Sequence, residues 1–151
     1  VQQESSLFAR HLEQTLVPTC KELGGGIVAY SPVARGILAS AHDATPEDWR
    51  ASIPYLSADN LADNLSLVEK VKAMAAAKGA TEAQLCLAWL TAQGAVPIPG
   101  TTKQAHAEEN MKAAAIALSE EEAKTLADLG AQVKGERGSE SYMQMSFQAN
   151  S

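Results

Sequence analysis

The sequence predicts an α/β fold with parallel strands, and two segments carry most of that prediction. Residues 26–36 read GIVAYSPVARG, and residues 95–103 read AVPIPGTTK. Each is a short apolar run that ends abruptly in Pro, Gly and hydroxyl residues, as a buried parallel strand does where it meets a loop. We therefore expect three strands, at residues 1–3, 27–30 and 95–98, with helices between them.

Apolar residues at helical spacing predict five helices around these strands. The expected helices run from near Glu13 to Gly24, from Leu61 to near Gly79, from Thr81 to Gly94, from Gln104 to Ala115, and from Ser119 to Leu129. Thr81 to Gln84 forms a capping box, and Trp89 lies on an apolar stripe, which favours a place in the core.

Two stretches lack such periodicity. Residues 37–60 contain Trp49 and Tyr55, and they fit either a functional loop beside a binding site or a packed surface loop anchored by these two rings. Beyond Gly130 the composition turns to Gly, Ser, Glu and Gln. We expect one domain at residues 1–129 and a largely irregular tail at residues 130–151.

Composition limits the classes of partner and compartment. The 151 residues are 46% hydrophobic and carry a net charge of -6, which argues against nucleic acid or an anionic membrane as general partners. No apolar run is long enough to span a bilayer, and no signal peptide is present. Cys20 and Cys86 lack CxxC spacing, which favours reduced, buried thiols over a disulfide or metal and fits a cytoplasmic location. His11 and His42 are expected to be exposed to solvent.

The segment after the third expected strand has the features of an anion site. Gly100, two threonines and Lys103 precede a predicted helix, and residues 95–107 contain no acidic residue. Free backbone N–H groups and the positive end of the helix dipole converge at such a terminus, so an anion is stabilised there.

Together and in this order, the two motifs resemble the NADPH-binding end of the aldo-keto reductase barrel. The start of the chain, VQQESSLFAR, is similar to that family's sixth strand and the turn after it. The resemblance implies the C-terminal part of a TIM (β/α)8 barrel, from about strand six onward. A complete barrel needs about 250 residues, and the first residue is Val, so we expect the chain to be a piece of a larger protein.

The resemblance also assigns residues to parts of the cofactor. Gln2 would bind the nicotinamide carboxamide, and Tyr30 would stack on the nicotinamide ring. The segment with Ser31, Pro32, Val33 and Arg35 would lie against the pyrophosphate, with the guanidinium available as a bidentate partner.

The adenosine half of the cofactor would lie at the second motif. Gly100, Thr101, Thr102 and Lys103, with His106 one helical turn later, would bind the 2′-phosphate, which implies a preference for NADPH over NADH. Glu109 and Asn110 match the pair that contacts the adenine.

The resemblance places the family's catalytic Tyr, Lys, Asp and His on earlier strands, so we expect no catalytic residue and no metal site in this chain. The implied function is the cofactor-binding portion of an NADPH-dependent oxidoreductase that reduces aldehydes or ketones to alcohols. One alternative is a non-catalytic NADP-binding regulatory or channel-associated subunit on the same barrel. A second is an unrelated helical interaction domain. Without the missing N-terminal half, we expect the chain to be inactive and poorly stable.

Overall fold

The computed structural model describes residues 1–40 and 48–146 and contains one parallel sheet. Strands β1 (Gln2–Glu4), β2 (Ile27–Tyr30) and β3 (Ala95–Pro97) lie in the order β1-β2-β3, and β2 pairs in parallel with both neighbours. The three predicted strands are therefore confirmed, with β1 beginning and ending one residue later than expected. The sheet is open, because β1 and β3 each have only β2 as a partner strand within the described residues.

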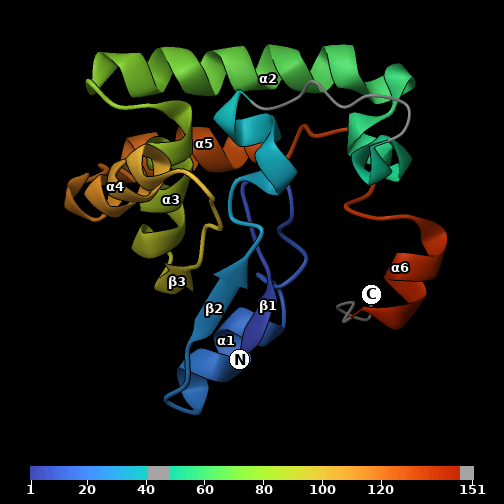
Figure 1. Ribbon diagram of the computed structural model, residues 1–151. Coiled ribbons are helices and arrows are strands. Elements are labelled where there is room, and N and C mark those ends of the chain that lie inside the picture. The colour runs from blue at the N-terminus through green and yellow to red at the C-terminus, as the bar shows by residue number, and fades with distance from the viewer. Residues whose placement is uncertain (41–47, 147–151) are drawn as a thin grey trace.

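Six α-helices surround the sheet in the described part of the chain. They are α1 (Leu16–Glu22), α2 (Ala58–Ala77), α3 (Glu82–Ala92), α4 (Gln104–Lys112), α5 (Glu120–Gly130) and α6 (Glu140–Met145). Helix α1 begins at Leu16 rather than near Glu13, which puts Pro18 in the first turn, where its missing N–H is not needed. Figure 1 shows α2 lying beyond the C-terminal end of β2 and α6 apart from the other helices, near the C-terminus.

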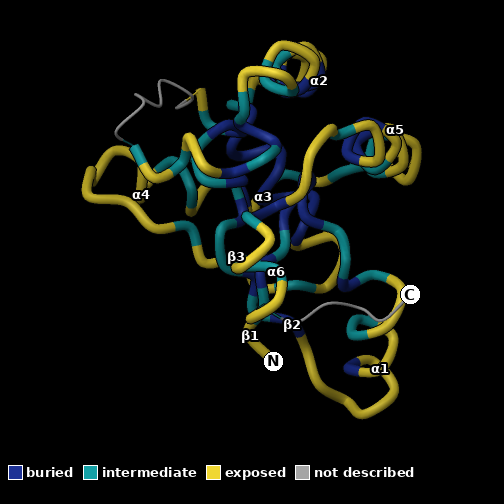
Figure 2. Tube along the Cα trace, turned by 90° about the vertical axis from the view of Figure 1, so that its right-hand side faces the viewer, coloured by how far each residue is buried: buried dark blue, intermediate teal, exposed yellow. Residues whose placement is uncertain are grey.

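Helix α3 forms the centre of the core. Every residue from Glu82 to Leu90 is buried, and the buried trace in the middle of Figure 2 includes this helix. Trp89 is 2% exposed, and its Nε1 donates a hydrogen bond to the Ala123 carbonyl at 3.1 Å. The predicted core position of Trp89 is confirmed, and so is the capping box between Thr81 and Gln84.

The segment between β2 and α2 contains three short 3₁₀ helices, η1 (Ala34–Ala39), η2 (Trp49–Ser52) and η3 (Pro54–Leu56). Tyr55 is 1% exposed and packs edge-on against Phe8, whereas Trp49 is 61% exposed. Tyr55 therefore anchors this segment and Trp49 does not. His42 lies outside the described residues.

The segment after Gly130 is more ordered than the sequence indicated. It ends in helix α6, and Asn64 of α2 holds it by accepting from the Lys134 N–H at 2.9 Å and donating to the Lys134 carbonyl at 2.8 Å. The Tyr55 N–H donates to the Glu136 carbonyl. Helix α6 was not predicted, because the partners that hold this segment are remote in sequence. A domain boundary at residue 130 stays a prediction.

Two further predictions concern buried side chains. Cys20 and Cys86 are free and buried, as expected. His11 does not have the exposed imidazole that was expected, because both ring nitrogens are buried without a hydrogen-bond partner.

In the described part of the chain, no helix is long and apolar enough to span a membrane.

Candidate functional site

A cavity of about 580 Å³ joins the two motifs that the sequence singled out. Strands β2 and β3 are adjacent and parallel, so their C-terminal ends meet at the same edge of the sheet. The loop after β2 forms one side of the cavity and the start of α4 with its preceding loop forms another. The predicted site residues in its lining are Ser31, Pro32, Val33, Arg35, Gly100, Thr101, His106, Glu109 and Asn110.

The other predicted residues lie outside this cavity. Thr102 and Lys103 are exposed, and Lys103 is the N-cap residue of α4. Gln2 and Tyr30 line a second cavity, of about 370 Å³, together with Tyr142 and other residues from the C-terminal segment. Eleven of the thirteen predicted residues therefore line one of these two cavities, and Thr102 and Lys103 line neither.

The backbone after β2 adopts an uncommon conformation. Ser31, Ala34 and Arg35 have φ angles of 50°, 48° and 55°, and Gly36 has a φ of 103°. Left-handed backbone is costly for residues with a side chain, and it concentrates at binding and catalytic sites. Here it turns the chain sharply at the cavity wall.

The start of α4 has no side-chain cap, as is also the case at α1 and α2. Thr81, Ser119 and Ser139 cap α3, α5 and α6 with side-chain hydrogen bonds, whereas Lys103 makes no such bond at α4. The N–H groups of the first turn of α4 are thus left without a side-chain cap, next to the loop that contains Gly100 and Thr101.

Glu109 links α4 to the capping box of α3. Its Oε1 accepts from the Thr81 hydroxyl at 2.7 Å, and its carbonyl accepts from Gln84 Nε2 at 2.9 Å. Thr81 and Glu82 also line the 580 Å³ cavity, as does Arg50 of η2. These three residues were not predicted. Arg50 shows that part of the segment between β2 and α2 lies beside the cavity, while the choice between a functional loop and a packed surface loop stays open.

The Arg35 guanidinium is not freely available, contrary to expectation. Its Nη2 forms an ion pair with Glu4 Oε1 at 3.1 Å, and the group lies over the Trp49 ring, 5.1 Å from the centroid. The sequence did not indicate this pair, because Glu4 ends β1 whereas Arg35 lies in η1, 31 residues later. The role of Arg35 at the pyrophosphate stays a prediction.

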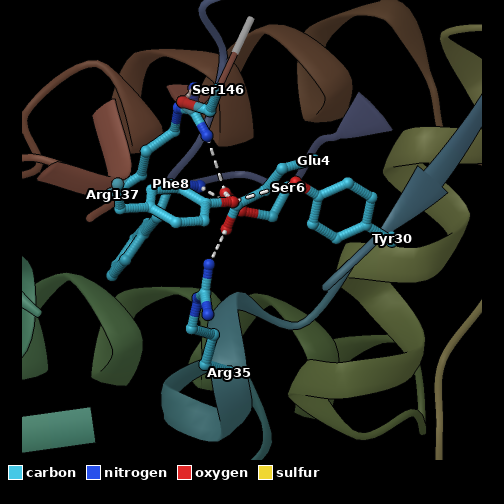
Figure 3. A network of polar contacts seen from close by, with 8 residues as sticks. Glu4, Ser6, Phe8, Tyr30, Arg35, Arg137 and Ser146 are labelled. Carbon is cyan, nitrogen blue, oxygen red and sulfur yellow. Dashed lines mark hydrogen bonds and ion pairs between the residues drawn. The ribbon is translucent and has the colours of Figure 1, made fainter. Parts of the chain in front are cut away.

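Glu4 is the centre of a buried polar network at the end of β1. It is 1% exposed, and Arg35 and Arg137 approach its carboxylate from opposite sides (Figure 3). Arg137 Nη1 lies 2.8 Å from Glu4 Oε2, and the same oxygen accepts from the Tyr142 hydroxyl at 2.8 Å. The Tyr142 hydroxyl is also 2.9 Å from the Tyr30 hydroxyl. Burial raises the pKa of Tyr142, and its hydrogen bonds to Tyr30 and Glu4 raise the pKa further, so this phenol stays protonated.

Sequence reasoning missed Glu4, Arg137 and Tyr142. A carboxylate on a strand of a buried parallel sheet was the one available signal, since such a charge needs a partner. The identity of the partners could not be read, because Arg137 and Tyr142 lie in the segment expected to be irregular.

Residues 1–131 match the family model described as the Aldo/keto reductase family. This chain belongs to that family. The predicted resemblance is therefore confirmed.

Solved structures agree with the family assignment. The chain is 31% identical to a thermostable aldo-keto reductase bound to the inhibitor epalrestat, with a TM-score of 0.63, over 85% of this chain and 38% of the other. It is 28% identical to an aldo-keto reductase from Klebsiella pneumoniae in complex with NADPH, with a TM-score of 0.60 and the same coverages of 85% and 38%. Its fold also matches that of the glycerol dehydrogenase from Gluconobacter oxydans, with a TM-score of 0.80 at 22% identity, over 87% of this chain and 42% of the other.

The comparisons also show how much of the related proteins this chain covers. The chain spans about two fifths of the solved aldo-keto reductases that it resembles. Its three parallel strands and surrounding helices have the fold of part of the family's barrel, as an open sheet.

Proposed function

We propose that this chain forms the NADPH-binding portion of an oxidoreductase that reduces aldehydes or ketones to alcohols, with the catalytic residues outside this sequence. The observation that carries the proposal is the 580 Å³ cavity, which brings the loop after β2 and the start of α4 together around most of the predicted cofactor-binding residues. An extended nucleotide fits a cleft formed by two loops at the C-terminal ends of adjacent parallel strands.

The phosphate end has the chemistry that the cofactor needs. The start of α4 has no side-chain cap, so its N–H groups are free to bind the oxygens of the 2′-phosphate. Lys103 adds a positive charge at this terminus, and His106 lines the cavity one turn later. Because NADH lacks the 2′-phosphate, we propose a preference for NADPH.

The nicotinamide end would lie at the 370 Å³ cavity. Gln2 and Tyr30 come from the adjacent strands β1 and β2, and both line this cavity. Gln2 would bind the carboxamide, and the Tyr30 ring would hold one face of the nicotinamide. A homologue at 28% identity has been solved with NADPH, which supports the same cofactor here.

When bound, the cofactor would supply the hydride. The residues of this chain would orient it: they bind the phosphates, hold the ring and exclude water from one face. Tyr55 is not a candidate proton donor to substrate, because it is 1% exposed and lines neither cavity.

We further propose that additional strands complete a barrel around this sheet. β1 and β3 each leave one edge without a partner strand in the described part of the chain. Val96 in β3 and Ile98 just after it are 60% and 43% exposed. Unpaired strand edges and exposed apolar side chains favour further pairing. The small-molecule carbonyl substrate would bind mainly in the part of the protein that contributes those additional strands.

We also propose a cytoplasmic location, which the two free, buried cysteines fit.

The test uses the full-length protein that contains this sequence. NADPH affinity is measured by fluorescence titration, and turnover by NADPH oxidation with a panel of aldehydes and ketones. Binding with turnover is the expected result. Binding without turnover on any carbonyl would favour the non-catalytic NADP-binding subunit, and absence of NADPH binding would overturn the proposal.

A further inference from the structure

Two tyrosine hydroxyls and a carboxylate form a directed hydrogen-bond chain beside the 370 Å³ cavity. Tyr142 Oη lies 2.8 Å from Glu4 Oε2 and 2.9 Å from Tyr30 Oη. Glu4 is paired with two arginines, so its carboxylate is an acceptor only and Tyr142 must donate to it. The remaining hydrogen bond therefore runs from the Tyr30 hydroxyl to the Tyr142 oxygen.

Tyr142 is itself held firmly from several sides. The guanidinium carbons of Arg35 and Arg137 lie 5.3 and 5.4 Å from the centroid of its ring, within the range of a cation–π interaction. Gly138 packs against the same ring, since a Cβ at that position would be 2.1 Å from Tyr142 Cδ1. Such packing fixes the hydroxyl in space.

We propose that Tyr142 is a positioning residue for the nicotinamide site: its hydroxyl fixes the ring of Tyr30, and with it the surface against which the nicotinamide lies. This inference rests on the proposed function. Tyr30 is the last residue of β2 and lines the cavity, and the hydrogen bond to Tyr142 holds the hydroxyl end of its side chain in place. A supporting residue of this kind matters because hydride transfer is sensitive to small displacements of the reacting ring.

The same segment also forms a wall of the cavity. Met145 and Ser146, at the end of α6, line it together with Tyr142. The Ser146 hydroxyl accepts from Arg137 Nη2 at 2.8 Å, so the arginine that pairs with Glu4 also holds this wall. Arg137 and Tyr142 thus attach the C-terminal segment to Glu4 at the end of β1, next to Tyr30.

The test compares Tyr142→Phe with Gln144→Ala in the full-length protein. The first variant removes one hydroxyl and keeps the ring, whereas the second changes an exposed residue of the same helix. Three quantities are measured: NADPH affinity, the fluorescence emission of bound NADPH, and the single-turnover rate of hydride transfer. The unfolding temperature is recorded for each variant.

We expect Tyr142→Phe to slow hydride transfer about tenfold and to change the emission of bound NADPH, while affinity stays within about twofold. Affinity is set mainly at the phosphate end, which this variant does not touch. Gln144→Ala should leave all three quantities unchanged. Tyr30→Phe breaks the same hydrogen bond, so the double variant should be no slower than the slower single variant.

Other outcomes overturn the inference. If Tyr142→Phe behaves like Gln144→Ala, the hydroxyl does not position Tyr30. If Tyr142→Phe lowers NADPH affinity, hydride-transfer rate and unfolding temperature together, the role of Tyr142 is only structural. The same conclusion follows if the effects of Tyr142→Phe and Tyr30→Phe on the rate add in the double variant. A wild-type protein that does not bind NADPH would instead overturn the proposed function itself.

Discussion

Glu4 and Arg137 are 133 residues apart in the sequence and form an almost completely buried ion pair, with 2.8 Å between Arg137 Nη1 and Glu4 Oε2. The side chains are 1% and 4% exposed. Arg35 and Tyr142 bind the same carboxylate, so its charge is neutralised and its oxygens are satisfied. This arrangement fastens the C-terminal segment to the end of β1, beside the proposed nicotinamide site.

Removal of the Glu4 charge should strongly destabilise the protein. Glu4→Gln removes the negative charge that pairs with both Arg35 and Arg137. Breaking one side of a buried ion pair costs about 3–5 kcal/mol. Urea unfolding of the full-length protein measures the change. Asp128→Asn is the matched control, because the pair between Lys124 and Asp128 is exposed and should contribute less than about 1 kcal/mol. Equal effects from the two variants would contradict the importance of the buried network.

Gly135 should not tolerate a side chain. Its φ is +88°, and a Cβ would be 2.7 Å from the Pro54 carbonyl and from Asn60 Nδ2. Gly135→Ala therefore combines backbone strain with a clash, and we expect a loss of about 2–4 kcal/mol of unfolding free energy. Gly79→Ala isolates the strain, since Gly79 has a φ of +65° and open space around it, and it should cost about 1 kcal/mol. A smaller loss for Gly135→Ala than for Gly79→Ala would show that the C-terminal segment is not packed as described.

His11 should make the protein less stable in mild acid. Burial, and then the charge of Arg137, lower its pKa to about 4, while the nearby Glu4 charge partly opposes this. The unfolded chain binds a proton near pH 6.5, whereas the folded state does not until about pH 4. The contribution of His11 is therefore fully present above pH 6.5 and is lost as the pH falls toward 4.

His11→Gln cannot take up a proton, so the variant should lose less stability than the wild type between pH 7.5 and pH 5. Urea unfolding at both pH values measures this difference. Identical pH dependence in the two proteins would show that His11 titrates normally in the folded state.

Lys103 should contribute to the affinity for NADPH and much less to the affinity for NADH. In the full-length protein, Lys103→Ala removes a charge-assisted contact to the 2′-phosphate, which should weaken NADPH by about 1.5–3 kcal/mol, roughly tenfold to a hundredfold. NADH affinity should change far less. Lys124→Ala, an exposed lysine on α5, is the control. Equal losses for both cofactors would remove Lys103 from the phosphate site.

Local patterns in the sequence were sufficient for much of the fold. The strand at Ile27–Tyr30, the capping box at Thr81 and the core position of Trp89 are each encoded within a few residues. The family resemblance implied that the two loops bind the same cofactor. In the structure both loops line one cavity. The start of α1 and the extent of β1 differ slightly, because helix and strand ends depend on neighbours in space.

The sequence by itself determined the strands, most of the helices, the family and which residues to expect near a nucleotide, because periodicity, capping and loop motifs are local properties. Only the tertiary structure decided that Arg35 is paired with Glu4 and that the segment around Arg137 packs against the strand ends. It also decided that Tyr142 supports Tyr30. The physical reason is that a buried charge must find partners wherever the fold brings them, and no local pattern records a partner more than a hundred residues away.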